Sequence, residues 1–290
     1  MTGGTTATGI AEKVRAEAAR LLENGEVGVV IGYTRAPHTD IAAPCFVRSV
    51  ADADKLIFDQ TCLGNLAVYL AKPEVRDLGR IAIVVKGCDL RAVNVLLREH
   101  VVARENLYLI GVACPGVGNP LLDKCASCAV QLPRGCDSII GETDFQPREI
   151  SDKDRRRLAE MEAMSFEERW AFWSKEFERC IRCYACRQAC PLCYCKQCVV
   201  EKNRPQWIES SPHLRGNFSW NVIRAFHLTG RCIGCGECER VCPENIPLGL
   251  INDKMAELVK EWFDFESGLS PDARAPFTVW SQDDVDHGIL

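Results

Sequence analysis

Several features of common protein classes are missing from this 290-residue chain. No apolar run reaches the roughly 18 residues that a membrane helix needs, so no membrane span is expected. The first ten residues, MTGGTTATGI, lack a basic start followed by an apolar stretch, and a secretory signal is therefore not expected. A net charge of -5 gives no support to binding through nucleic-acid phosphates, so we expect no nucleic-acid partner.

Short motifs of several enzyme classes are missing as well. The sequence has no GxGxxG dinucleotide fingerprint, no P-loop and no GxSxG nucleophile turn. None of its five histidines lies in a ligand pattern such as HExxH. Hydrolase, NTPase and Rossmann-type interpretations therefore have no local support.

Cysteine, in contrast, is abundant, with 18 residues. Disulfide scaffolds are usually short, secreted and poor in core, whereas this chain is long enough to build two domains. A reducing cytoplasm keeps thiols free. We therefore expect a cytoplasmic protein whose cysteines are mainly metal ligands.

The strongest pattern is a repeat of one cysteine spacing. CIRCYACRQACP begins at Cys180 and CIGCGECERVCP begins at Cys232, and both read C-x2-C-x2-C-x3-C-P. This is the bacterial ferredoxin spacing, in which the fourth cysteine of each copy binds the other cluster. The repeat predicts two 4Fe-4S clusters, whereas zinc sites more often show two well-separated CxxC pairs.

The crossing rule assigns the ligands. The first cluster is predicted to bind Cys180, Cys183, Cys186 and Cys242. The second is predicted to bind Cys232, Cys235, Cys238 and Cys190. Three more cysteines, Cys193, Cys195 and Cys198, follow the first copy. They are interpreted either as further ligands or as buried thiols beside a cluster.

The first half of the chain reads as alternating strands and helices. Strands are expected at 26–33, 55–59, 80–87 and 106–114. A helix is expected at 89–100 with Asp89 as its N-cap. This alternation favours an α/β domain with a mostly parallel sheet over residues 1–150.

The second half shows little strand pattern. Residues 151–179 have apolar residues at helical spacing without glycine or proline, and predict a helical linker. An α-rich dicluster ferredoxin-like domain is expected at 180–265, with an amphipathic helix at 247–263. An extended C-terminal tail is expected at 266–290.

Four cysteine-containing segments of the first half carry a family resemblance. KGCD contains Cys88, VAC ends at Cys114, CASC spans Cys125 and Cys128, and CDSIIGE begins at Cys136. In this order they resemble the module of the coenzyme F-420 hydrogenase and formate dehydrogenase beta subunits, over about half of the chain. The ferredoxin repeat follows this module here, whereas many relatives place it first.

The resemblance implies a third 4Fe-4S cluster on Cys88, Cys114, Cys125 and Cys128. Structural zinc and plain buried thiols remain the alternatives for these four residues. The family also implies FAD next to this cluster. However, DQTCLGNLAVYL at 59–70 replaces the family's usual G-S-K-Y-like segment, and KGCD lacks the usual proline. FAD is therefore kept as an alternative cofactor.

Taken together, these patterns predict an iron–sulfur electron-transfer subunit. Its partners would be other redox subunits of a complex of the hydrogenase, formate dehydrogenase or heterodisulfide-reductase-like type, as the resemblance implies. A flavin-containing subunit acting on a deazaflavin or NAD(P)H is the second hypothesis. A zinc-binding assembly factor is the third.

Overall fold

The computed structural model describes residues 7–143, 145–151 and 153–279. Its first part is built on a five-stranded sheet with the order β2-β1-β3-β4-β5. The strands are β1 (Val29–Thr34), β2 (Ala43–Val47), β3 (Ile81–Val85), β4 (Leu107–Val112) and β5 (Ser138–Ile140). All neighbouring pairs are parallel except β1 and β2, which are antiparallel. The predicted α/β class with a mostly parallel sheet is confirmed.

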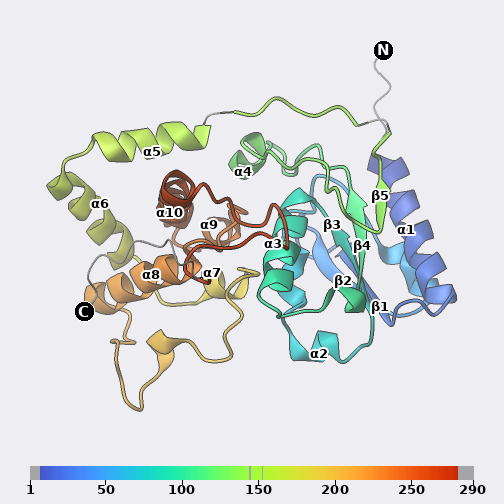
Figure 1. The fold of residues 1–290 in the computed structure, drawn as a ribbon, viewed down its shortest axis with the longest axis horizontal. Coiled ribbons are helices and arrows are strands. Elements are labelled where there is room, and N and C mark those ends of the chain that lie inside the picture. The colour runs from blue at the N-terminus through green and yellow to red at the C-terminus, as the bar shows by residue number, and fades with distance from the viewer. Residues whose placement is uncertain (1–6, 144, 152, 280–290) are drawn as a thin grey trace.

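Helices cover this sheet on both sides (Figure 1). Helix α1 (Ala7–Glu23) lies on one side and α3 (Gly87–Arg98) on the other, and both contact the central strands. Strand β3 is buried along its whole length, as expected for a strand covered on both faces. Two short helices, α2 (Pro73–Arg76) and α4 (Asp123–Ala126), lie in the connections.

Two expectations for the first half were wrong in detail. No strand forms at 55–59, where only Ile57 makes an isolated bridge, to Tyr33. The apolar residues there are buried in the core beside β1, so their pattern reflects packing. Asp89 is not the N-cap of α3, because the helix starts earlier and Lys86 is the capping residue. Asp89 instead accepts a hydrogen bond from the Lys86 backbone N–H at 2.9 Å.

The second part is helical, as predicted. Its helices are α5 (Lys153–Ala163), α6 (Phe166–Glu178), α7 (Ala185–Gln188), α8 (Leu214–Leu228), α9 (Glu237–Arg240) and α10 (Leu248–Phe263). Four 3-10 helices complete the described elements, at Val50–Lys55, Leu66–Tyr69, Arg104–Asn106 and Val199–Glu201. Helix α6 packs on α8 through aromatic rings, with Phe177 and Phe218 at 5.6 Å between centroids.

Polar and apolar contacts join the two parts. Leu192, Leu228 and Ile233 from the cysteine-rich half belong to the same buried core as the sheet. The Arg231 guanidinium binds both carboxylate oxygens of Glu99, at the end of α3, at 2.6 and 2.8 Å. Because a shared core and a half-buried ion pair both resist separation, the cysteine-rich half is held at one end of the α/β domain.

The chain after α10 returns to the first part. Arg91 on α3 donates to the carbonyl of Ser267 at 2.7 Å, and Asn94 donates to that of Gly268 at 2.9 Å. Residues 264–279 contain neither helix nor strand. The rest of the expected tail, 280–290, lies outside the described residues.

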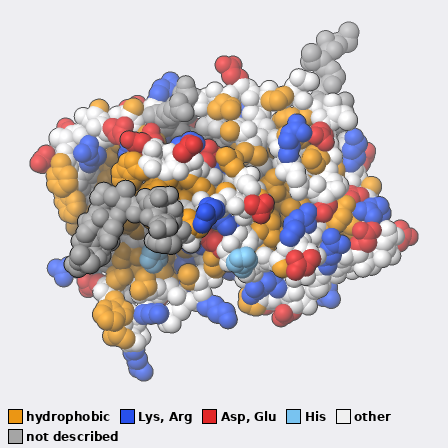
Figure 2. Space-filling model, viewed as in Figure 1, with side chains coloured by type: hydrophobic (Ala, Val, Ile, Leu, Met, Phe, Trp, Pro, Cys, Tyr) orange, Lys and Arg blue, Asp and Glu red, His pale blue; other side chains and the backbone are white. Residues whose placement is uncertain are grey.

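The surface shows both signs of charge. On the face in Figure 2, Lys and Arg side chains are interspersed with Asp and Glu over the described residues. This mixture agrees with the small net charge of -5. In the part of the chain that the structure describes, no helix is long and apolar enough to cross a membrane.

Candidate metal centre

The two ferredoxin-type repeats share one backbone shape. Tyr184 precedes α7 with φ 60°, and Gly236 precedes α9 with φ 66°. Arg182 and Gly234, two residues earlier in each copy, have φ 57° and 65°. This left-handed conformation suits glycine and is costly for other residues. In the first copy the Arg182 side chain fixes it, donating to the Gly216 carbonyl at 2.7 Å.

The second repeat opens onto a cavity of about 530 Å³, which we call the second-block cavity. Its lining includes the four cysteines predicted to hold the second cluster, namely Cys190, Cys232, Cys235 and Cys238. Burial raises the pKa of Cys232 to about 11 and that of Cys238 to about 12. These thiols would therefore stay protonated unless a cation compensated for deprotonation, which is what metal binding does. A sulfur-lined cavity of this kind fits an inorganic cluster.

The first repeat packs into a separate apolar cluster. Cys180, Cys186 and Cys242 lie there with Phe177 and Trp220. Burial raises the pKa of Cys186 to about 11, and Cys180 and Cys242 are close enough to raise it further. The structure thus brings together three of the four cysteines predicted for the first cluster. The fourth, Cys183, is exposed at the surface.

A second sulfur-lined cavity lies where the α/β domain meets the cysteine-rich half, and we call it the first-domain cavity. It measures about 290 Å³ and is lined by Cys88, Cys114, Cys125 and Cys128. Cys88 lies in the first turn of α3, directly after β3, and Cys114 follows β4. Since β3 and β4 are adjacent parallel strands, their carboxyl ends meet at one edge of the sheet. All four cysteines predicted for a third cluster therefore face one space.

The two cavities share a wall. Lys124, Ile233, Gly234 and Cys235 line both of them. The Lys124 ammonium binds the Glu237 carboxylate at 2.6 Å and the Leu63 carbonyl at 3.2 Å. Glu237 also pairs with Arg240 at 2.6 Å. An ion pair between the two halves of the chain thus lies between the two cavities.

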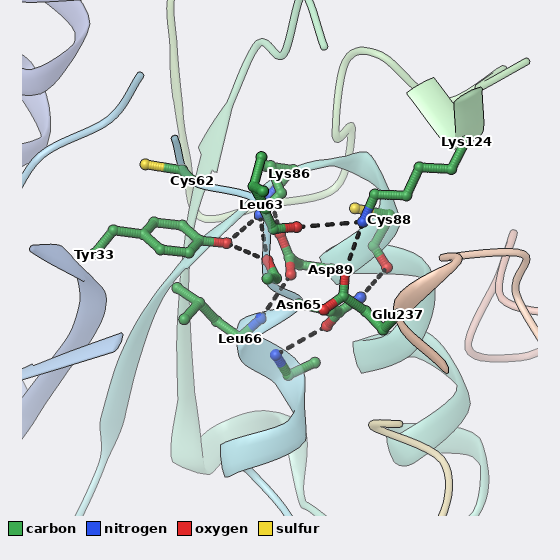
Figure 3. Close-up of polar contacts among 12 residues, drawn as sticks. Tyr33, Cys62, Leu63, Asn65, Leu66, Lys86, Cys88, Asp89, Lys124 and Glu237 are labelled. Carbon is green, nitrogen blue, oxygen red and sulfur yellow. Dashed lines mark hydrogen bonds and ion pairs between the residues drawn. The ribbon is translucent and has the colours of Figure 1, made fainter. Parts of the chain in front are cut away.

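A buried polar network surrounds Lys86 and Asp89, the residues on either side of Gly87 and Cys88 (Figure 3). The Lys86 ammonium forms an ion pair with Asp89 at 2.9 Å, donates to the Gly64 carbonyl at 2.9 Å, and hydrogen-bonds the Tyr33 hydroxyl. Asp89 also accepts from the Leu66 backbone N–H at 2.8 Å. Because buried charges need several partners, this network fixes the first turn of α3. It therefore also holds Cys88 in place.

The additional cysteines after the first repeat have different surroundings. Cys193 is hydrogen-bonded to Cys190, which lowers the pKa of Cys193 to about 7. Cys198 packs against the apolar cluster of the first repeat, and Cys195 is exposed. Whether these three bind metal stays an open prediction. Elsewhere, Cys62 is buried in the sheet core and Cys45 is half-buried against it.

The cysteines line spaces instead of meeting at one point. Among the described residues, no group of three or more His, Cys, Asp or Glu side chains is placed to hold a single metal ion. The ligands of a four-iron cluster surround a larger inorganic core, each thiolate binding a different iron. The donor set, which is sulfur throughout, and the cavities that it lines fit such clusters.

Sequence reasoning missed three polar residues at these cavities. Arg224 and Asn252 line the second-block cavity, and Lys124 lines both cavities. The Asn252 side-chain amide lies 3.7 Å from the Cys238 sulfur. Arg224 lies in the insertion between the repeats and Asn252 lies after them, so no cysteine motif marks either. Lys124 adjoins CASC, but only the fold brings it next to Glu237.

Comparison with known proteins agrees with this geometry. Residues 176–246 match the 4Fe-4S dicluster domain family. The chain is 24% identical to the F420-dependent formate dehydrogenase subunit beta of Methanocaldococcus jannaschii, covering 86% of this chain and 89% of the relative. Along most of its length, the chain resembles formate dehydrogenase beta subunits. A second such subunit, F420-dependent formate dehydrogenase 1 subunit beta of Methanococcus maripaludis, is 21% identical over 87% of this chain and 89% of its own length.

A third relative matches a shorter part of the chain. Polyferredoxin protein MvhB of Methanothermus fervidus is 34% identical, over 28% of this chain and 23% of its own length. The predicted resemblance to a beta-subunit module joined to a ferredoxin domain is confirmed. The dicluster match likewise supports two 4Fe-4S clusters and an iron–sulfur electron-transfer role.

Proposed function

We propose that this chain is the iron–sulfur subunit of a hetero-oligomeric oxidoreductase of the formate dehydrogenase or hydrogenase type. The observation that carries the proposal is the shared wall between the two sulfur-lined cavities. A dicluster ferredoxin alone would need no such continuity with an α/β domain. The formate dehydrogenase subunits with which the chain aligns support the choice of complex.

The ligand sets of this proposal follow the cysteine spacing for the two ferredoxin-type clusters and the family resemblance for the third. Cys180, Cys183, Cys186 and Cys242 would hold the first cluster. Cys190, Cys232, Cys235 and Cys238 would hold the second, and Cys88, Cys114, Cys125 and Cys128 the third. When bound, such clusters would supply one-electron transfer at potentials set by charge, hydrogen bonds and burial.

The protein's own residues position and insulate these groups. The left-handed turns at Gly234 and Gly236 bend the second repeat toward its cavity. The Lys86–Asp89 pair holds the first turn of α3, and the Lys124–Glu237 pair holds the α/β domain against α9. Among the proposed ligands, Cys114, Cys125 and Cys186 are buried, and burial of this kind protects oxidisable sulfur and iron from water.

The same proposal includes a division of the chain and a cellular site. Residues 1–150 would form the module with the third cluster, 151–179 a helical linker, 180–265 the dicluster domain and 266–290 the tail. All 18 cysteines are free in the structure. Free thiols in this number fit a reducing compartment, and we assign the protein to the cytoplasm.

A flavin-containing subunit is the second candidate function. It is favoured by the F420-dependent enzymes among the relatives, whose names include a deazaflavin coenzyme. In this case FAD would bind next to the first-domain cavity, and the chain would exchange electrons with a deazaflavin or NAD(P)H. Its segment at 59–70 departs from the family pattern, so we rank this function second.

Metal and flavin analysis of anaerobically purified protein tests these proposals. About twelve irons per chain are expected for three clusters of four irons each. About eight irons would refute the third cluster and leave the dicluster domain. A flavin absorption spectrum would favour the second candidate. Zinc without iron would overturn both and favour an assembly factor.

A further inference from the structure

Arg224 is a buried cation with an unusual set of neighbours. It lies on α8 within the insertion between the two cysteine repeats, and only 5% of it is exposed. One guanidinium nitrogen donates to the backbone carbonyl of Cys186 at 3.2 Å. The same side chain lines the second-block cavity together with Cys190 and Cys238. One arginine therefore touches the ligand sets proposed for both ferredoxin-type clusters.

Among the described residues, no acidic side chain forms an ion pair with Arg224, and its Nε has no hydrogen-bond partner. The neighbouring Arg231, by contrast, is paired with Glu99 at 2.6 Å. A buried and unpaired guanidinium is costly unless an anionic group lies nearby. Once they are deprotonated, the sulfurs of Cys190 and Cys238 in the same cavity would supply such anionic groups.

The sulfurs of Cys190 and Cys238 line the same cavity as the Arg224 guanidinium, and the Cys186 carbonyl accepts its hydrogen bond. A 4Fe-4S cluster with four thiolates is anionic and gains a further negative charge when reduced. A fixed positive charge beside it therefore stabilises the reduced form more than the oxidised form.

We propose that Arg224 is a shared electrostatic tuning residue that raises the reduction potentials of both ferredoxin-type clusters. Its position between the ligand sets makes the effect common to the two clusters. The third cluster, on the far side of the shared cavity wall, would be affected little. This inference rests on the ligand sets of the proposed function.

Potentiometric titration of the anaerobic protein, followed by EPR, tests the proposal. Signals are assigned to clusters with the ligand variants Cys183→Ser and Cys235→Ser. In Arg224→Gln, the equilibrium constant for reducing each of the two clusters is expected to fall about tenfold, equivalent to about 59 mV for a one-electron couple. Arg215→Gln is the matched control, because Arg215 lies on the same helix but is exposed. It should leave both potentials unchanged.

Iron analysis separates failure of this inference from failure of the proposed function. Fewer than about eight irons in the wild-type chain would refute the dicluster assignment itself. Wild-type iron content in Arg224→Gln with unmoved potentials would overturn only the tuning role. A shift of one cluster alone would overturn the shared role.

Arg224→Lys decides the outcome if the glutamine variant loses iron. The lysine variant retains the charge but not the planar donor geometry. Iron content and potentials close to those of the wild type would support a role of charge. Iron loss in the lysine variant as well would show that guanidinium packing is what matters, and would overturn the proposal.

Discussion

The ion pair between Lys124 and Glu237 offers a quantitative test of how the two halves of the chain are held together. Its two side chains are 11% and 2% exposed, and the atoms lie 2.6 Å apart. Burial alone would raise the pKa of Glu237, but the nearby Lys124 and Arg240 outweigh burial and lower it. Glu237 is therefore ionised at neutral pH and balances two cations at once.

This arrangement makes the two single substitutions unequal. Glu237→Gln leaves Lys124 and Arg240 without their carboxylate, and breaking a buried pair in this way costs about 3–5 kcal/mol. Lys124→Met leaves Glu237 paired with Arg240, so the main loss is the charged hydrogen bond between Lys124 and Glu237, at about 1.5–3 kcal/mol, together with the longer one to the Leu63 carbonyl. At about 2 °C per kcal/mol, these losses lower Tm by about 6–10 °C and about 3–6 °C.

Thermal unfolding of the anaerobic holoprotein at a fixed scan rate measures the difference. The double variant should lose less than the sum of the two single losses, because its first substitution already removes the pair. Glu257→Gln serves as the control, since its pair with Lys254 is exposed and should be worth under about 1 kcal/mol. Equal losses for Glu237→Gln and Lys124→Met, or strictly additive losses in the double variant, would refute the reasoning.

The effect of pH on this pair has a definite sign. A carboxylate with a lowered folded-state pKa contributes stability above its ordinary pKa of 4.5, and that stability disappears as pH falls through the lowered value. The difference in Tm between wild type and Glu237→Gln should therefore be constant between about pH 6 and 8. A difference that changed across this interval would point to another titrating group.

Two further predictions concern the cluster ligands and the wall of the first-domain cavity. Cys190→Ser should disturb the EPR signal of the cluster held by the second repeat, because the ligands cross over, whereas Cys195→Ser should leave it intact. Gly87→Ala should lower iron from about twelve to about eight atoms per chain, because a Cβ there would lie 1.7 Å from the Val130 carbonyl oxygen and displace the CASC segment. Gly64→Ala is its control, since the nearest atom to that Cβ would be 4.0 Å away.

Much of the architecture could be read from the sequence because it follows from short-range rules. Alternating apolar strands and helices predicted the sheet, and the helical spacing at 151–179 and 247–263 predicted α5, α6 and α10. The edge strand β2 escaped notice, because Ala43–Val47 is short and contains a proline. The LIF run after Lys55 led to a strand prediction that was wrong. Buried apolar residues resemble a strand in sequence even where no β-ladder forms.

The candidate site likewise contains residues that short sequence motifs mark and residues that only the fold brings to it. Cysteine spacing predicts the ligand sets of the two ferredoxin-type clusters, and the family resemblance implies the set of the third. Arg224 and the Lys124–Glu237 pair could not be predicted, because their partners are 38 and 113 residues distant in the chain. Nothing in a local pattern separates a buried arginine from the many that lie on solvated helix faces. The residues that adjust a metal centre are therefore less visible in sequence than those that bind it.

Asn252 provides a test of whether a nearby polar side chain can change the reduction potential of one cluster alone. Its side-chain amide lies 3.7 Å from the Cys238 sulfur and donates to the Leu248 carbonyl at 2.7 Å. A hydrogen bond to a ligand sulfur stabilises the reduced cluster, and at a net value of about 0.5–1 kcal/mol it raises the potential by about 20–40 mV. Asn252→Leu should lower the potential of the second-repeat cluster by this amount and leave the first-repeat cluster unchanged.

The matched control is Asn221→Leu, because Asn221 is also buried in a helix but donates to a backbone carbonyl and not to sulfur. Both substitutions remove a buried amide, so a general effect of packing would shift potentials in both variants. A shift confined to one cluster in Asn252→Leu, beside a shift of both in Arg224→Gln, would separate a local hydrogen bond from a shared charge. Equal shifts of the two clusters in Asn252→Leu would show instead that the amide acts through the fold of α10, and the hydrogen-bond argument would then be wrong.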